Sequence, residues 1–431
     1  MSLHCENNLS PPFFPFLCST RTIYSTSLME ESPTALLREL VRFDTVSHKP
    51  NLPLLQWVEG YLRQYRFLTE IHYAKGEKEG AFHGNLIATL PDRRGGVSGG
   101  LVCTGHSDVV SPEGQAWASP PFDLQERDGK LYGRGACDMK GYIACVLSLA
   151  KEVSQWSLEK PFHLWLTYNE ETDMMGVREL LASPTLSSRL VGCVGCIVGE
   201  PTNMQIVHAH KGVYFHEYTS IGKAAHAALQ TSGYNANQAA GEMLTYLFQL
   251  RDTIARGSPF DEGYPVPHTT LCPSMVHGGI VYNTVTDRCT IGFDLRNIPS
   301  DDPDRYYTMV KAFVEAQDRR VKTAAAPHEG CGAVVERTEE VPAFGGRADC
   351  PLVHALRTAS EEGDRLVKVN FCSEAGYIQK GAGIDVVVCG PGDIAQAHQP
   401  DEYVTVAQME KCVRVLRRTI AILCGGKQSS M

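Results

Sequence analysis

The chain has 431 residues, of which 43% are hydrophobic and 21% charged, so it has the composition of a globular protein and is too long for one ordinary core. The formal net charge is -9 and the Lys and Arg residues are dispersed, which argues against nucleic acid or an acidic membrane surface as a partner. No apolar run approaches the roughly 20 residues that span a bilayer. The cysteines are scattered through apolar segments, which favours reduced thiols in the cytoplasm over a disulfide framework.

The first segment, residues 1–29, differs in composition from the rest of the chain. It is rich in proline, serine and aromatic residues without a period, which predicts a disordered N-terminal extension. An organellar transit peptide is the alternative, because "STRTIYSTS" is rich in Ser and Thr and contains no acidic residue.

Strands and helices alternate over the next part of the chain. The stretch "SPTALLRELVRFDTVS" predicts a helix with Ser32 as N-cap and Pro33 in the first turn. The segments that follow are predicted, in order, as the strands "NLIATL" and "GGLVCTG", the helix "GYIACVLSLAKEV", the strand "HLWLTY", the helix "GVRELLA" and the strand "CVGCIVGEP". This alternation indicates an α/β domain whose mainly parallel sheet has helices on both faces.

The pattern changes near Lys211. Here the sequence predicts an alternating strand "KGVYFHEYTSIG", a long helix "NANQAAGEMLTYLFQLRD", two strands and a turn in "GGIVYNTVTDRCTIGFDLRNI", a helix "DPDRYYTMVKAFVEAQ" capped by Asp301 or Asp302, and a strand "GAVVERTEEV". The α/β rhythm then resumes up to the last helix, "VAQMEKCVRVLRRTIAIL". We therefore expect an α/β domain in two parts, residues 30–210 and 342–431, interrupted by a smaller α+β domain at residues 211–341.

Polar side chains that suit metal binding follow four of the predicted strands, and one more precedes a helix. They are His106 and Asp108 after "LVCTG", Glu170 and Glu171 after "LWLTY", Glu200 after "GCIVG", His398 after "VVVCGPG", and Asp138 in "YGRGACDMKG". Ligands of open α/β sheets bind outside the carboxyl ends of the strands, so these loops should meet in one crevice.

Several carboxylates in one crevice cannot all stay ionised without a cation. Two His and three or four carboxylates suit zinc or a similar ion, and this many ligands favours two ions that share a bridging carboxylate. Each residue alone has a simpler explanation: a lone His is usually a hydrogen-bonded loop residue, and Asp138 could be a helix N-cap. Their joint placement at strand ends favours the metal site.

At this point the chain resembles a known family. The motifs "GHSD", "YGRGACDMKG", "NEET", "GEP" and "GPGDIAQAHQPDEY" occur in the order typical of the two-zinc superfamily of aminoacylases, carboxypeptidase-like deacylases and succinyl-diaminopimelate desuccinylases. The segments "VGEPTNMQIVHAHKG" and "NFCSEAGYIQ" are most similar to the acetylornithine deacetylases within it, and the resemblance covers nearly all of residues 30–425. It implies hydrolysis of the amide bond of N-acyl amino acids, with N2-acetylornithine cleaved to ornithine and acetate in arginine biosynthesis.

The resemblance also implies a set of metal ligands. His106 and Glu200 would hold one divalent ion, Glu171 and His398 the other, and Asp138 would bridge them. The ions would be zinc, with cobalt as the alternative.

The catalytic roles implied by the resemblance fall on three further residues. Glu170 would act as general acid and base, and Asp108 would orient His106. His226 in "GKAAHAAL" would stabilise the oxyanion, from the same chain or from the partner in a homodimer formed through the smaller domain, which would act as a lid. Ala227 and Ala228 depart from the family, which has small hydroxyl residues there, so a plain polar residue at a loop-helix junction is the alternative.

Three residues are candidates for substrate binding. Arg296 in "FDLRNI" suits a substrate carboxylate, or else forms an ion pair with a nearby aspartate. Asn283 in "VYNTV" lies close to a family position whose amide contacts substrate. Glu374 in "CSEAGY" follows the deacetylase pattern and would contact the substrate or a metal ligand, with an acid at a helix start as the alternative.

Two other functions stay open at the level of sequence. A dipeptidase or carboxypeptidase would use the same metals on a peptide bond. A catalytically inactive relative would serve as a binding protein, although the candidate base and all five candidate ligands are present.

Overall fold

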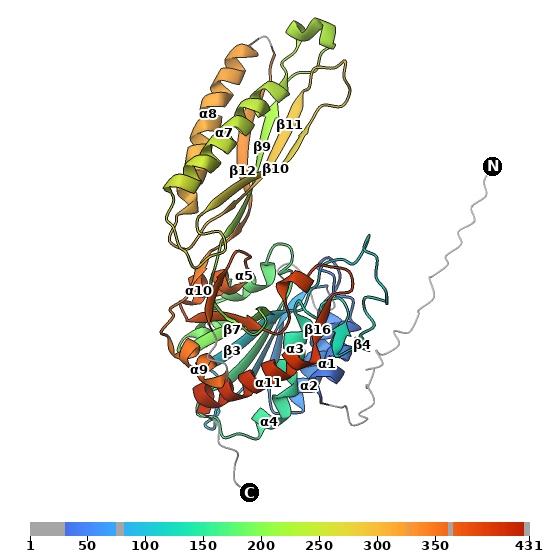
Figure 1. The fold of residues 1–431 in the computed structure, drawn as a ribbon, viewed down its shortest axis with the longest axis vertical. Helices are drawn as coiled ribbons and strands as arrows, with labels where there is room; N and C mark the ends of the chain where they lie inside the picture. The colour runs from blue at the N-terminus through green and yellow to red at the C-terminus, as the bar shows by residue number, and fades with distance from the viewer. Residues whose placement is uncertain (1–30, 75–81, 327, 361–364, 426–431) are drawn as a thin grey trace, which may run out of the picture.

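The computed structural model describes residues 31–74, 82–326, 328–360 and 365–425. The predicted N-terminal extension, residues 1–29, lies outside these ranges. Figure 1 shows two units: a smaller unit made from residues 213–341, and a larger unit made from the described residues on either side of it. None of the helices in the described ranges has the length and apolar character needed to cross a membrane.

A nine-stranded mixed sheet forms the middle of the larger unit. Its path runs through β1 (Leu68–Tyr73), β2 (Gly84–Leu90), β6 (Phe162–Thr167), β3 (Gly100–His106), β7 (Cys193–Pro201), β15 (Val386–Gly390), β8 (Ile206–His210) and β13 (Phe344–Gly345), and β14 (Leu366–Val369) also pairs with β8. The four central strands β6, β3, β7 and β15 are parallel. The outer pairs β1–β2, β2–β6, β15–β8 and β13–β8 are antiparallel. The predicted α/β class is confirmed, with the consecutive parallel pairs at the centre of the sheet.

Helices cover both faces of this sheet, as predicted. One face packs against α1 (Pro33–Val41), α2 (Leu52–Arg63), α3 (Lys140–Ser148), α4 (Ala150–Ser154), α9 (Pro351–Ala359) and α11 (Val406–Ile420). The other face packs against α5 (Met175–Ala182), α6 (Pro184–Leu190) and α10 (Ala375–Ala382). Successive side chains of a strand point to opposite faces, so Leu101 and Cys103 enter the first core and Val102 enters the second.

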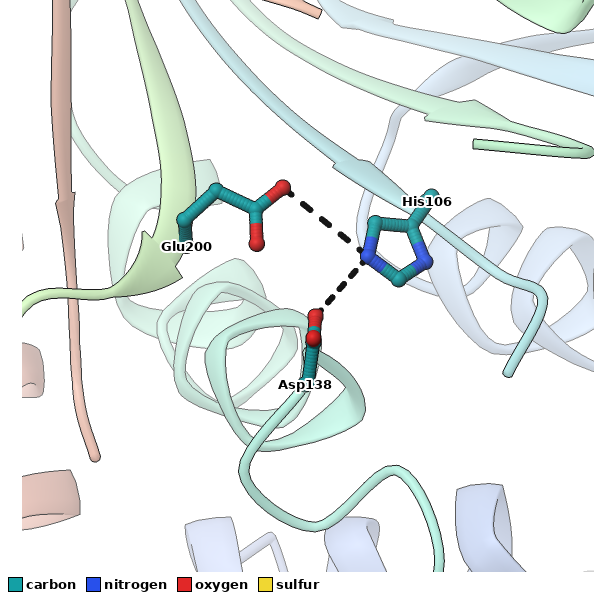
Figure 2. A group of neighbouring side chains, drawn as sticks. All are labelled: His106, Asp138 and Glu200. Carbon is teal, nitrogen blue, oxygen red and sulfur yellow. Dashed lines mark hydrogen bonds and ion pairs between the residues drawn. The ribbon is translucent and has the colours of Figure 1, made fainter. Parts of the chain in front are cut away.

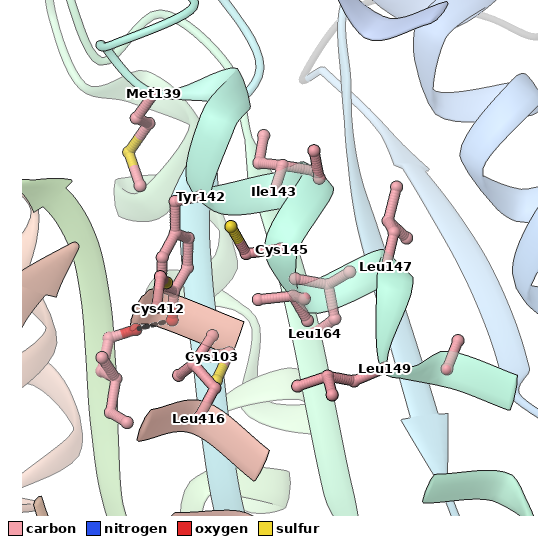
Figure 3. Close-up of a cluster of buried hydrophobic side chains, with 14 of the residues drawn as sticks. Cys103, Met139, Tyr142, Ile143, Cys145, Leu147, Leu149, Leu164, Cys412 and Leu416 are labelled. Carbon is pink, nitrogen blue, oxygen red and sulfur yellow. Dashed lines mark hydrogen bonds between the residues drawn. The ribbon is translucent and has the colours of Figure 1, made fainter. Parts of the chain in front are cut away.

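The core beside α3 fixes the elements that carry the polar loops. Figure 3 shows Tyr142 of α3 packed close to Cys103 of β3 and Cys412 of α11. The Tyr142 hydroxyl donates to the carbonyl oxygen of Ile197 at 3.3 Å, and its ring lies 2.0 Å from where a Cβ of Gly199 would be. Only glycine therefore allows β7 and α3 to approach so closely.

The smaller unit has a four-stranded antiparallel sheet in the order β10 (Thr270–Gly278), β11 (Arg288–Arg296), β9 (Val213–Ile221) and β12 (Gly332–Val341). Helices α7 (Ala236–Gly257) and α8 (Pro303–Ala324) pack on one face of it, and the short 3₁₀ helix η1 (Ala227–Ser232) follows β9 (Figure 1). Both predicted helix starts that were assigned a cap are confirmed, because Ser32 accepts from the Ala35 amide and Asp302 accepts from the Asp304 amide.

One strand prediction in this unit is wrong. The segment "GGIVYNTV" is not a strand, and the partner of β11 is the earlier segment β10. Ile280 is 94% exposed in the intervening loop, so its apolar run has no core to face. Pro273 lies at a bulge of the edge strand β10, which hid the strand pattern in the sequence.

A small sheet in the larger unit links two distant parts of the chain. Its order is β16 (Tyr403–Thr405), β5 (Lys130–Tyr132) and β4 (Gln125–Arg127). The chain reaches Asp138 soon after β5 and leaves His398 shortly before β16, so this sheet holds both loops at the same place.

Candidate metal centre

The five predicted metal ligands come together at the carboxyl edge of the parallel strands. They form two groups in which the ligand atoms lie within 4.8 Å of one another: His106, Asp138 and Glu200, and Asp138, Glu171 and His398. The first group is buried, and the second opens towards solvent through His398. Asp138 belongs to both groups, as a bridging ligand must.

The two oxygens of Asp138 face different imidazoles. Its Oδ1 lies 3.0 Å from Nε2 of His106, and its Oδ2 lies 3.4 Å from Nε2 of His398. Around them, Glu200 Oε1 is 3.9 Å from His106 Nε2, and Glu171 Oε2 is 3.0 Å from His398 Nε2. Figure 2 shows His106, Asp138 and Glu200 converging on one point from β3, the loop before α3 and the end of β7. One carboxylate that faces two imidazoles through different oxygens could bridge two divalent ions.

The atoms of this cluster fit divalent cations. Oε1 of Glu171 and Oε1 of Glu200 are buried, and neither has a hydrogen-bond donor among the described residues. A buried carboxylate oxygen without a donor is costly, and a cation would satisfy it. Carboxylate oxygens with imidazole nitrogens are also the donor set that zinc prefers when no thiolate is present.

The protonation of the cluster points the same way. Burial, together with the charge of Asp138, raises the pKa of Glu171 to about 7 and that of Glu200 well above its usual range. Hydrogen bonds to Asp138 and Glu171 raise the pKa of His398 to about 10. Without a cation these side chains therefore retain protons, and metal binding would release them.

Asp108 supports two parts of the cluster through different atoms. His106 Nδ1 donates to the backbone carbonyl of Asp108 at 2.9 Å, which turns Nε2 towards the other ligands. The Asp108 carboxylate is 3.6 Å from the same Nδ1 and instead accepts from the backbone amides of Glu170 (3.1 Å) and Glu171 (3.3 Å). The backbone carbonyl of Asp108 thus orients the imidazole, whereas the family resemblance implied this role for its carboxylate. The carboxylate instead fixes the turn that carries both glutamates.

Glu170 lies beside the cluster but belongs to neither ligand group. Burial and the charge of Glu200 raise its pKa well above the usual range of a glutamate. A half-buried carboxyl group with a raised pKa, next to candidate metal ligands, is suited to accept a proton and to donate it again.

The helix-cap alternative for Asp138 is wrong. The N-cap of α3 is Met139, which makes no side-chain capping bond, and the Asp138 carboxylate points at the two imidazoles. Sequence reasoning missed a residue that holds this loop: Glu402, whose carboxylate accepts from the amides of Cys137 and Asp138. The only indication in the sequence was that Glu402 follows His398 by four residues in "AHQPDEY". An acidic residue at such a position is equally compatible with a solvated loop.

His226 and Asn283 lie together, away from the cluster of their own chain. Strand β9 leaves the larger unit at Val213 and ends at Ile221, so the loops that follow it lie at the outer end of the smaller unit (Figure 1). There the Ala227 amide donates to the carbonyl of Asn283, and the exposed His226 accepts from the Ala228 amide. The geometry brings these two candidates to each other and not to the five ligands.

Arg296 lies at the opposite, inner end of the same sheet. Its Nε is 2.9 Å from Asp294 Oδ2, which is the ion pair considered as the alternative to substrate binding, and its Nη1 donates to the Asn370 carbonyl at 3.5 Å. Burial raises the pKa of the Cys372 thiol to about 12, with Glu170 raising it further and Arg296 opposing the shift. The bond from Arg296 to the Asn370 carbonyl, two residues before Cys372, places Arg296 against the larger unit.

Glu374 is fully buried at the N-cap of α10, the helix-start position considered as the alternative. It makes no capping bond and belongs to neither ligand group, and burial raises its pKa to about 7. The charges of His106 and Asp108 both affect this pKa, so Glu374 lies near these two residues.

The mixed sheet has helices on both faces, and carboxylates and imidazoles cluster at the carboxyl ends of its parallel strands. These features define the class of protein as a metallohydrolase. The chain belongs to the peptidase family M20/M25/M40, whose family model matches residues 102–422. It is 35% identical to an acetylornithine deacetylase of Myxococcus xanthus over 91% of this chain and 98% of that protein. It is 30% identical to the acetylornithine deacetylase of Proteus mirabilis over 88% of this chain and 92% of that protein. The protein is a metallohydrolase that acts on amide bonds.

Solved structures share the fold. A tripeptidase from Staphylococcus aureus superposes with a TM-score of 0.70 at 20% identity, over 92% of this chain and 99% of that one. A metallo-carboxypeptidase from Sulfolobus solfataricus gives 0.69 at 15% identity, over 90% and 98%. A dinuclear metal-binding peptidase of the same family from Bacillus subtilis gives 0.58 at 15% identity, over 90% and 96%.

Chelated protein is expected to lose stability as pH rises from 5 to 8. The pKa values of Glu170, Glu171 and Glu200 in the folded state are raised above the unfolded value near 4.3, so their contribution is complete below that value and is lost as pH rises through the folded values. The free energy of unfolding should fall by about 1.4 kcal/mol per pH unit for each carboxyl group that titrates. Urea unfolding with EDTA measures this, and added zinc should flatten the slope. Equal stability of the chelated protein at pH 5 and 8 would contradict the described crowding of charge.

Proposed function

We propose that the protein removes the acetyl group from N2-acetylornithine, using two divalent ions, zinc or cobalt. The observation that carries the proposal is a cluster of five ligands with a free, protonatable glutamate beside it. The choice of substrate is supported by relatives named acetylornithine deacetylase, which match nearly the whole chain at 28–35% identity. The structural neighbours named as peptidases share the fold at 20% identity or less and so do not favour a peptide substrate.

In this proposal His106 and Glu200 would hold one ion, Glu171 and His398 would hold the other, and Asp138 would serve both. Bound divalent ions polarise an acyl oxygen and lower the pKa of water, which makes amide hydrolysis accessible near neutral pH. The remaining chemistry belongs to residues of the chain.

Glu170 acts as the general base and then as the general acid. Its carboxylate accepts the proton of the attacking water and later returns that proton to the leaving amine. Its raised pKa supports this role, because such a carboxyl group is a stronger base than an ordinary glutamate and holds the accepted proton until the amine leaves. Asp108 holds its backbone in place through the amide of Glu170.

We assign residues 211–341 to a lid and dimerisation domain, and residues 30–210 and 342–431 to the catalytic domain. The outer end and the edge strand of the smaller unit expose a group of apolar side chains: Met275, Val276, Ile280, Val281 and Tyr282. Apolar surface of this kind favours contact with another protein surface. A partner chain would also bring His226 and Asn283 to a cluster that they do not reach in their own chain.

The substrate's own charges suggest where it binds. The carboxylate of an N-acyl amino acid matches the guanidinium of Arg296, which would exchange its ion pair with Asp294 for the substrate. Asn283 would contribute an amide from the lid, and Glu374 would contact the polar end of the substrate or a metal ligand.

Substrate profiling is the direct test of the proposed reaction. The zinc-loaded protein should release ornithine and acetate from N2-acetylornithine with a higher kcat/KM than it shows for any of a panel of dipeptides. Other N-acetyl amino acids belong in the panel as controls for the side chain. A preference for dipeptides would establish the peptidase alternative, and metal-loaded protein without turnover on either class would establish the inactive relative.

Glu170→Ala should keep its metals and lose hydrolysis. Loss of a general base lowers kcat by about 10²–10⁴-fold, while the five ligands stay intact. Metal analysis and steady-state kinetics of the same preparation measure both. The matched control is Glu410→Ala on the exposed side of α11, which should leave both quantities unchanged. Metal loss in Glu170→Ala would instead make Glu170 a ligand.

Mixed dimers test the position of His226. If it acts on the partner's cluster, coexpressed His226→Ala and Glu170→Ala chains should regain about a quarter of wild-type activity, because half of random dimers are mixed and each has one intact site. Each variant alone should be inactive. Coexpression of Glu170→Ala with the double variant is the control and should stay inactive. A monomeric active protein, or no recovery in verified mixed dimers, would refute the shared site.

A further inference from the structure

A buried carboxylate lies under the loop that carries Asp138. Glu402 is 1% exposed and accepts four hydrogen bonds. Oε1 accepts from the amides of Cys137 (2.8 Å) and Asp138 (3.0 Å). Oε2 accepts from the amide of Gly135 (3.1 Å) and from Arg134 Nη1 (2.7 Å). The acidic side chain therefore binds three backbone amides of one loop from a segment more than 260 residues later in the chain.

The same network reaches the loop of His398. Arg134, also 1% exposed, donates through Nη2 to Oε1 of Gln115, and Gln115 Nε2 donates to the carbonyl oxygen of His398 at 2.8 Å. The Arg134 guanidinium further reaches the Gln399 carbonyl at 3.4 Å. One buried ion pair thus connects the backbones of two loops whose side chains face each other in the cluster.

We propose that Glu402, braced by Arg134, is a positioning residue that sets the separation of Asp138 and His398. The inference rests on the proposed dinuclear centre. Asp138 must face two imidazoles at once, so a small rotation of its backbone would take one oxygen out of reach. The amide of Asp138 is itself held by Glu402, which fixes the direction in which the side chain leaves the loop.

The hydrogen bonds that Glu402 accepts distinguish a positioning role from a general contribution to stability. All four partners of Glu402 are donors, so only a group with two acceptor oxygens satisfies them. Glutamine has the same size, but its NH₂ group would face two donors wherever its carbonyl points. Glu402→Gln should therefore release one side of the loop while it leaves the packing volume unchanged.

The test is cobalt binding to metal-free full-length protein, followed by the visible spectrum of bound cobalt and by equilibrium dialysis. Glu402→Gln should bind cobalt about 10–100-fold more weakly than wild type, with a changed spectrum. Arg134→Lys keeps a positive charge beside Glu402, but lysine lacks the second guanidinium nitrogen that donates to Gln115. This variant should therefore fold and show a smaller loss of cobalt affinity than Glu402→Gln. Glu152→Gln is the matched control, because Glu152 is paired with Arg417 between α4 and α11, and it should behave as wild type.

The outcomes are distinguishable. If Glu402 only stabilised the fold, the variants would show a lower unfolding midpoint with unchanged cobalt affinity and spectrum, and that result would overturn the positioning role. Should Glu402→Gln fail to fold, an unchanged cobalt affinity and spectrum in Arg134→Lys would overturn it equally. If the wild type itself bound no cobalt, the proposed metal centre would be wrong and the positioning role with it.

Discussion

Repulsion between carboxylates at one edge of the sheet is the constraint on which the rest of the site depends. The central strands are parallel, so their carboxyl ends deliver acidic side chains to the same place. Burial, together with the charge of Asp138, raises the pKa values of Glu171 and Glu200, and one oxygen of each has no donor among the described residues. A cluster of this kind is stable only when protons or cations compensate its charge, which couples metal binding to folding.

Buried strands and one braced loop hold the charged side chains of the cluster close together. His106 ends a strand buried on both faces, and Glu200 ends the neighbouring strand, against which α3 packs so closely that Gly199 has no space for a side chain. The bridging residue, by contrast, lies on a loop. That loop gains its precision from the buried Glu402 and Arg134 instead of from a strand.

The sequence predicted the elements whose signal is local. The bounds of β7 and β12 coincide with the apolar and alternating segments that predicted them, and two helices begin at the caps that their Ser and Asp residues indicated. The strand expected around Ile280 failed because an apolar run becomes a strand only where a partner and a core are available. The edge strand β10 was hidden for the opposite reason, since its partner in space compensates for a proline that weakens the local pattern.

The candidate ligands were accessible from sequence because residue type and strand-end position both pointed to them, and the family motifs agreed. Their supporting contacts were not accessible. His106 donates a hydrogen bond to the backbone carbonyl of Asp108, and Glu402 accepts from backbone amides more than 260 residues away. Backbone donors and acceptors carry no signature of their own in the sequence, so only the folded chain shows which loops they join.

Glu170 and Glu171 have identical side chains, and only their positions give them different surroundings. The Asp108 carboxylate accepts from both of their amides, so the turn is fixed at both residues. From this fixed turn Glu171 extends to His398, while Glu170 faces the charge of Glu200 without joining a ligand group. The chemistry of the two carboxyl groups is the same in isolation. Their difference follows from the turn that the Asp108 carboxylate holds in place. Asp108 therefore positions both glutamates as well as the imidazole of His106.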